Sequence, residues 1–161
     1  SAAFLGPMEE GGQPGKGPHL VGKKDDLIKA KNTVVTAGGR DLLVVHHQGV
    51  FYALDCYCYH SGGSLQNGDI EEIGSRPCII CPKHKYKISL ADGEGLYKGT
   101  DTTVTPPVTT WLTKGVKQRV HAVTEADGDV YVTLSEGDWV ESDFYQGEKG
   151  KEKRAKAEEL E

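Results

Sequence analysis

The chain is poor in several kinds of residue, and each shortage excludes a class of protein. Apolar residues make up 37% of the 161 residues, and apolar runs such as 42–45 are far shorter than the roughly 20 residues of a membrane-spanning helix. Lys and Arg number 19 against 24 Asp and Glu, and no basic stripe indicates a nucleic-acid-binding surface. The start does not resemble a secretory signal. We therefore expect a soluble, monomeric, cytoplasmic protein with reduced thiols.

The two ends differ in composition from the middle of the chain. Residues 1–18 are dominated by Gly and Pro, which predicts a flexible tail because such a segment buries too little apolar surface to become ordered. Residues 148–161 are nearly all Glu, Lys, Arg and Ala without an apolar stripe, which predicts a frayed helix or a solvated tail. Residues 19–147 hold enough apolar sequence for one domain with a compact core.

The middle of the chain contains β-branched and apolar runs separated by short Gly turns. Turns of this length join antiparallel strands, so an all-β fold is expected. The predicted strands are 19–22, 33–36, 40–47, 50–55, 70–73, 76–80, 87–90, 118–123 and 129–134. The glycines at 93, 95 and 99 are interpreted as a turn cluster, and residues 105–108 as a stiff, extended turn.

Two short segments carry the candidate metal ligands. Cys58-Tyr59-His60 and Cys81-Pro82-Lys83-His84 each contain one thiol and one imidazole among turn-forming residues. A single spacer residue in the first segment is tight if both of its ligands must bind one ion. It is no obstacle in a two-iron centre in which cysteines bind one iron and histidines the other, because each segment then gives one ligand to each iron.

Other interpretations of the Cys and His residues stay open at this point. Zinc also binds two Cys and two His, and the four residues could lie near each other by chance. Cys56 and Cys78 could be alternative ligands or a disulfide pair, although each is more simply a small buried apolar residue. The remaining histidines in strands, His46, His47 and His121, lack a neighbouring ligand motif and are interpreted as structural or exposed.

These segments resemble the Rieske ferredoxins over residues 19–145, most strongly over 58–99. The resemblance implies an antiparallel β-sandwich or partial barrel with a small inserted cluster-binding subdomain of two loops at about 56–90. It also implies one Rieske-type 2Fe-2S cluster bound by Cys58, His60, Cys81 and His84. Within the family, the chain looks most like the soluble vertebrate members.

Some positions depart from the high-potential members of the family. Respiratory-chain Rieske proteins carry a further cysteine in each loop, joined by a disulfide, where this chain has Gly63 and Lys83. Lys85 replaces the usual Gly, and Tyr86 stands where high-potential members place a hydroxyl that hydrogen-bonds to sulfur. We expect a low-potential carrier for this reason.

The resemblance implies an electron carrier and not an enzyme. Such a protein passes single electrons from a flavin-dependent reductase to an acceptor such as an oxygenase. A Rieske oxygenase would need a second iron site with two His and a carboxylate, but only His121 follows His84. The chain also lacks a dinucleotide-binding fingerprint. A zinc-binding protein, or a structural or regulatory module without redox turnover, is the alternative.

Overall fold

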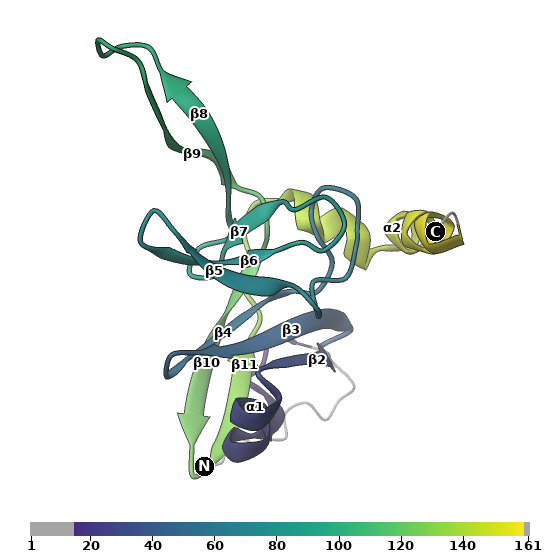
Figure 1. The fold of residues 1–161 in the computed structure, drawn as a ribbon. Coiled ribbons are helices and arrows are strands. Elements are labelled where there is room, and N and C mark those ends of the chain that lie inside the picture. The colour runs from purple at the N-terminus through teal and green to yellow at the C-terminus, as the bar shows by residue number, and fades with distance from the viewer. Residues whose placement is uncertain (1–14, 160–161) are drawn as a thin grey trace.

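The computed structural model describes residues 15–159, which form a mostly antiparallel β protein (Figure 1). A flexible tail is predicted for residues 1–18, and residues 1–14 of this segment lie outside the described residues. The strands are β1 His19–Lys23, β2 Asn32–Ala37, β3 Arg40–His47, β4 Val50–Asp55, β5 Asp69–Ile73, β6 Arg76–Ile80, β7 Lys87–Ser89, β8 Glu94–Asp101, β9 Val108–Val116, β10 Val120–Ala126 and β11 Asp129–Thr133. The helices are α1 Lys24–Ala30, the 3-10 helix η3 Glu141–Gln146 and α2 Glu148–Glu159.

The strands form two antiparallel sheets, as predicted. The first has the order β1-β11-β10-β4-β3-β2 and forms a nearly closed barrel. The second has the order β5-β6-β7-β8-β9 and is inserted between β4 and β10. No helix within residues 15–159 has the length and the apolar character to cross a membrane.

Strand β3 is the wall shared by the two halves of the core. Leu42 and Val44 pack inside the barrel, against Ala53 of β4 among others. Leu43 and Val45 point the other way and pack against the second sheet. All four β3 residues are at most 1% exposed, so both faces of the strand are buried. This explains why the segment is a continuous apolar run with no alternation.

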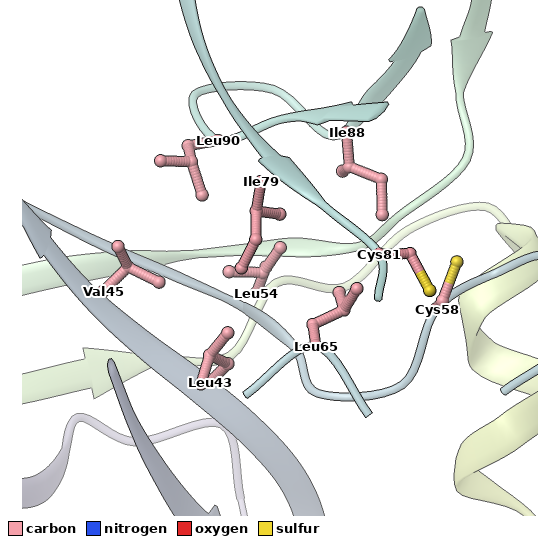
Figure 2. Packing of buried hydrophobic residues seen from close by; sticks show 9 residues of the cluster. All are labelled: Leu43, Val45, Leu54, Cys58, Leu65, Ile79, Cys81, Ile88 and Leu90. Carbon is pink, nitrogen blue, oxygen red and sulfur yellow. The ribbon is translucent and has the colours of Figure 1, made fainter. Parts of the chain in front are cut away.

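The core between the sheets ends at two cysteines. Ile79 and Ile88 of the second sheet, Leu90 directly after β7, and Leu65 of the loop between β4 and β5 pack together with the β3 residues (Figure 2). Cys58 and Cys81 belong to the same cluster and lie side by side at its edge (Figure 2). The apolar core therefore holds in place the bases of both segments that carry the candidate ligands.

The interpretation of the glycines at 93, 95 and 99 as a turn cluster was right for Gly93, which has a φ of 79° and whose N–H donates to the Ser89 carbonyl, but wrong for Gly95 and Gly99. These two lie in β8, which pairs with β9 in a long hairpin that extends away from the rest of the molecule (Figure 1). Cross-strand pairs stabilise it, including Tyr97 with Leu112 and Lys98 with Trp111, where the ammonium lies 5.4 Å from the ring centroid. Strand β9 is mostly exposed on both faces, so its sequence shows no alternation.

Candidate metal centre

The first ligand loop, residues 58–63, follows β4 and closes on itself with two backbone hydrogen bonds. Cys58 N–H donates to the Gly63 carbonyl at 2.8 Å, and Gly62 N–H donates to the Cys58 carbonyl at 2.8 Å. Gly62 has a φ of 80°, in the left-handed region that glycine adopts without strain. The loop is thus a tight turn with its cysteine at the base.

The second ligand loop, residues 81–86, follows β6 and repeats the same pattern. Cys81 N–H donates to the Tyr86 carbonyl at 2.8 Å, and Lys85 N–H donates to the Cys81 carbonyl at 2.9 Å. Lys85 is equivalent to Gly62 and has a φ of 62°. A left-handed conformation costs a residue with a side chain about 1–2 kcal/mol, so this loop holds local strain where the first has none.

The two candidate thiols are buried and adjacent. Cys58 is 0% exposed and Cys81 is 1% exposed, and their sulfur atoms face each other (Figure 2). A hydrogen bond between the thiols raises the pKa of Cys58, which is also raised by burial. The same bond lowers the pKa of Cys81 to about 6. The pair therefore favours negative charge on the Cys81 sulfur and a proton on Cys58.

Backbone amides face both sulfur atoms. The N–H groups of His60 and Ser61 hydrogen-bond to the Cys58 sulfur, and each bond lowers the pKa of this thiol. The N–H groups of Lys83 and His84 hydrogen-bond to the Cys81 sulfur, and each bond lowers the pKa of this thiol. Such donors stabilise a thiolate, which is the form that binds a metal.

The two candidate histidines lie at the exposed side of the loops. The ring centroids of His60 and His84 are 5.2 Å apart, with the ring planes at 86°. Tyr86 stacks on His60 at 3.9 Å between centroids, and the Lys114 ammonium of β9 lies 4.6 Å from the Tyr86 ring centroid. Partial burial and then the charges of His84 and Lys114 lower the pKa of His60, which favours the neutral imidazole that binds metals.

Gln118 supports the first ligand loop through hydrogen bonds to its backbone and to the residues before it. This role was not predicted from the sequence. Gln118 is 0% exposed. Its Nε2 donates to the carbonyls of Asp55 at 3.0 Å and Tyr57 at 2.8 Å, while its Oε1 accepts from Tyr59 N–H at 3.0 Å. A lone Gln before a strand carries no recognisable signal in the sequence.

A buried ionic network lies directly before the first ligand loop. Asp55 is 0% exposed and accepts hydrogen bonds from Arg40 at 2.8 and 2.7 Å and from Ser142 Oγ at 2.6 Å. His121 Nδ1 accepts from Ser135 N–H at 3.0 Å, which leaves its Nε2–H to donate to Asp55 at 3.0 Å. Burial raises the pKa of Asp55, but hydrogen bonds from Arg40 and His121 outweigh it and lower the pKa. His121 is therefore structural.

The remaining cysteines stand apart from this pair. Cys56 and Cys78 are buried and free, so they form no disulfide. Cys78 packs in a separate apolar cluster with Ile73 and Leu96, as expected of a small apolar residue.

Lys83 lies against Gly63, because a Cβ on that glycine would be 3.1 Å from Lys83 Cδ.

The candidate ligands form two pairs. Within residues 15–159, no three or more Cys, His, Asp or Glu side chains gather to hold a single metal ion. Two thiols instead lie together in the core, and two imidazoles lie together at the surface. This donor set fits a centre with two metal atoms, one bound through sulfur and one through nitrogen.

The two-sheet β fold is shared with Rieske ferredoxins of known structure. A family described as soluble Rieske-type ferredoxin matches residues 19–137, and the chain belongs to this family. The resemblance seen in the sequence is thereby confirmed. Members of the family are typically electron carriers rather than enzymes, and they typically bind a 2Fe-2S cluster.

Known relatives agree with this assignment. The human Rieske domain-containing protein is 46% identical over 126 residues, which cover 78% of this chain and 80% of the relative. The ferredoxin component of the alkene monooxygenase system of Xanthobacter autotrophicus is 35% identical over 72 residues, or 45% of this chain and 57% of the relative. The ferredoxin of carbazole 1,9a-dioxygenase from Nocardioides aromaticivorans shares the fold, with a TM-score of 0.55 and 20% identity over 73% of this chain and 98% of its own.

Proposed function

We propose that this chain is a low-potential electron carrier that holds one Rieske-type 2Fe-2S cluster through Cys58, His60, Cys81 and His84. The observation that carries the proposal is the pairing of two buried thiols with two exposed imidazoles on equivalent loops. When bound, the cluster would supply a single-electron redox couple. Residues 56–90 would form the cluster-binding subdomain of a domain that spans residues 19–147.

The chain's own residues set the net charge of the site and the exposed edge through which an electron would enter or leave. The amides that face Cys58 and Cys81 stabilise negative charge on sulfur inside an apolar core. His60 and His84 contribute ligands without charge, so the site is less negative than an all-cysteine site and accepts an electron more readily. The imidazoles also provide the exposed edge through which an electron would reach a partner.

We expect a potential in the lower part of the Rieske range of about −150 to +300 mV. Tyr86 occupies the position of the sulfur-bonding hydroxyl in high-potential members, but its ring is stacked on His60. Hydrogen bonds to sulfur raise the potential, so a site that lacks this bond would have a lower one. A redox titration with a midpoint near the top of the range would contradict this expectation.

The partners would be a flavin-dependent reductase and an oxygenase-like acceptor. The Xanthobacter relative is named as the ferredoxin component of a monooxygenase system. A relative from Photorhabdus laumondii, 31% identical over 97 residues, is named as the ferredoxin subunit of 3-phenylpropionate/cinnamic acid dioxygenase. Lys85 is exposed beside the imidazoles, and Lys114 lies close to Tyr86. An acidic partner surface would complement them although the chain is acidic overall. The four free thiols suit a reducing compartment such as the cytoplasm.

The decisive experiment is iron, zinc and sulfide analysis of the purified protein with absorption and EPR spectra of its reduced form. We expect two irons and two sulfides per chain and a Rieske-type EPR signal. The Cys81→Ala and His84→Ala variants should lose the cluster, whereas Cys78→Ala and His46→Ala should keep it as matched controls. One zinc per chain without an EPR signal, or an unchanged spectrum in the ligand variants, would refute the proposal.

A further inference from the structure

We propose that residues 141–154, here called the C-terminal brace, position the first ligand loop, and that Tyr145 and Arg154 are its positioning residues. The brace comprises η3 and the first half of α2 (Figure 1). It lies beyond residue 137, where the match to the ferredoxin family ends. The inference rests on the proposed function because it concerns how one histidine ligand is held.

Tyr145 contacts the ligand loop directly. Its side chain is 8% exposed, and its hydroxyl donates to the backbone carbonyl of His60 at 3.3 Å. A buried tyrosine that donates to the carbonyl of a candidate ligand restricts the peptide that follows this ligand. Tyr145 therefore acts on the backbone of His60.

Arg154 completes the contact from α2. Its guanidinium lies 3.6 Å from the ring centroid of Tyr57, the residue before Cys58, and its Nε donates to the Tyr145 carbonyl at 3.1 Å. One side chain thus joins α2 to η3 and to the start of the loop. The planar guanidinium makes both contacts at once, which a lysine ammonium would not reproduce.

Gly62 shows how closely the brace and the loop fit. A Cβ at this position would lie 2.5 Å from Tyr145 Cδ1 and 2.7 Å from Arg154 Cγ. The bare glycine backbone is therefore packed against both positioning residues. The Gly62 N–H closes the loop by bonding to the Cys58 carbonyl. The packing of Tyr145 and Arg154 on Gly62 therefore restricts the turn that carries His60.

The brace is itself anchored to the core at its other end. Ser142 is 0% exposed and bonds to the buried carboxylate of Asp55, and Asp143 forms an ion pair with Arg119 at 2.8 Å. Gly150 seats α2 on η3, since a Cβ there would lie 2.1 Å from the Phe144 carbonyl oxygen. An exposed 12-residue helix without an apolar face is marginal on its own, so these anchors give Arg154 a fixed position.

The two ligand loops provide an internal control, because the contacts of Tyr145 and Arg154 given above are with the first loop and with the residue before it. We expect Tyr145→Phe and Arg154→Ala to accelerate hydrogen exchange of the Cys58 and Gly62 amides at least threefold. The equivalent amides of the second loop, those of Cys81 and Lys85, should exchange as in the wild type. Equal exchange in the first loop of both variants and the wild type would overturn the proposal.

The loaded protein gives a second readout. Both variants should release iron to a chelator several-fold faster than the wild type, and the nitrogen hyperfine couplings of one histidine ligand should shift in the reduced state. Arg154→Lys should behave like Arg154→Ala, whereas Lys151→Ala, on the exposed surface of α2, should match the wild type. Release rates and couplings equal to the wild type in all variants would also overturn the proposal.

The two proposals fail separately. If the wild-type protein carries no iron and sulfide, the proposed function is wrong, but the exchange experiment still tests whether the brace restrains the loop. If the wild type carries the cluster and the first loop exchanges normally in both variants, the brace proposal is wrong and the carrier assignment stands.

Discussion

Replacing Asp143 with Asn tests the ionic network that joins η3 to the barrel. The carboxylate accepts two hydrogen bonds from Arg119, at 2.8 and 2.9 Å, and one from Val140 N–H at 3.0 Å. Arg40 also donates to it and links it to Asp55. The Asp143 side chain is 16% exposed, so solvent screens these interactions only in part. An amide keeps the shape but loses the charge and one acceptor.

The magnitude follows from the pKa of this carboxyl group. Burial raises the pKa of Asp143, but the hydrogen bonds from Arg119, Val140 and Arg40 outweigh burial and lower the pKa from 3.8 to about 2. At about 1.4 kcal/mol per pKa unit, the charged form adds about 2 kcal/mol to the free energy of unfolding. Because the pKa is lower in the folded state, this contribution is complete well above pH 4 and decreases as the pH falls toward 2.

The assay is denaturant unfolding of wild type and Asp143→Asn from pH 7 to pH 3. We expect the variant to be less stable by about 2 kcal/mol at pH 7, and the difference to shrink to about half of that near pH 3. Asp127→Asn is the matched control, because it removes the same charge at an exposed turn with a φ of 55°, which Asn tolerates. Equal stabilities at pH 7, or parallel pH curves, would refute the reasoning.

Three further substitutions test other parts of the structure, each by denaturant unfolding at pH 7. Lys85→Gly should stabilise the protein by about 0.5–1 kcal/mol by removing a left-handed residue with a side chain, and no gain would show that the loop is unstrained. Gln118→Leu should cost at least about 2 kcal/mol, since three backbone groups lose their partner; a neutral effect would contradict the role of Gln118. Ile79→Ala should cost about 2–5 kcal/mol because the side chain is 0% exposed, and a loss below 1 kcal/mol would argue against a packed core.

The sequence predicted the parts of the fold that depend on local signals. The hairpin of β3 and β4 shows alternating or continuous apolar residues around a glycine turn, and both features act within a few residues. The four candidate ligands were found for the same reason, because each loop places its thiol and imidazole within three residues. The structure brings them together in two pairs across the loops, and their role as cluster ligands remains a prediction for an experiment on the loaded protein.

The sequence did not reveal features that depend on distant contacts. The hairpin of β8 and β9 lacks alternation because little of β9 is buried, and the glycines in β8 suggested turns. Asp55 occupies a strand position where a charge usually faces solvent, and its burial depends on partners far away in the sequence, such as Ser142, which lies 87 residues further along the chain. Residues 148–161 show only charge and helical propensity, although Arg154 reaches the first ligand loop.

The two ligand loops are equivalent in backbone pattern but not in support. The second continues from β6 into β7 within one sheet, so hydrogen bonds of the sheet hold both of its ends. The first leaves the barrel at Asp55 and depends on Gln118, the buried ion pairs and the C-terminal brace. Since His60 comes from one loop and His84 from the other, their separation of 5.2 Å depends on both supports at once. The proposed brace thus adds support for the site from residues up to Arg154, beyond the region that the family match covers.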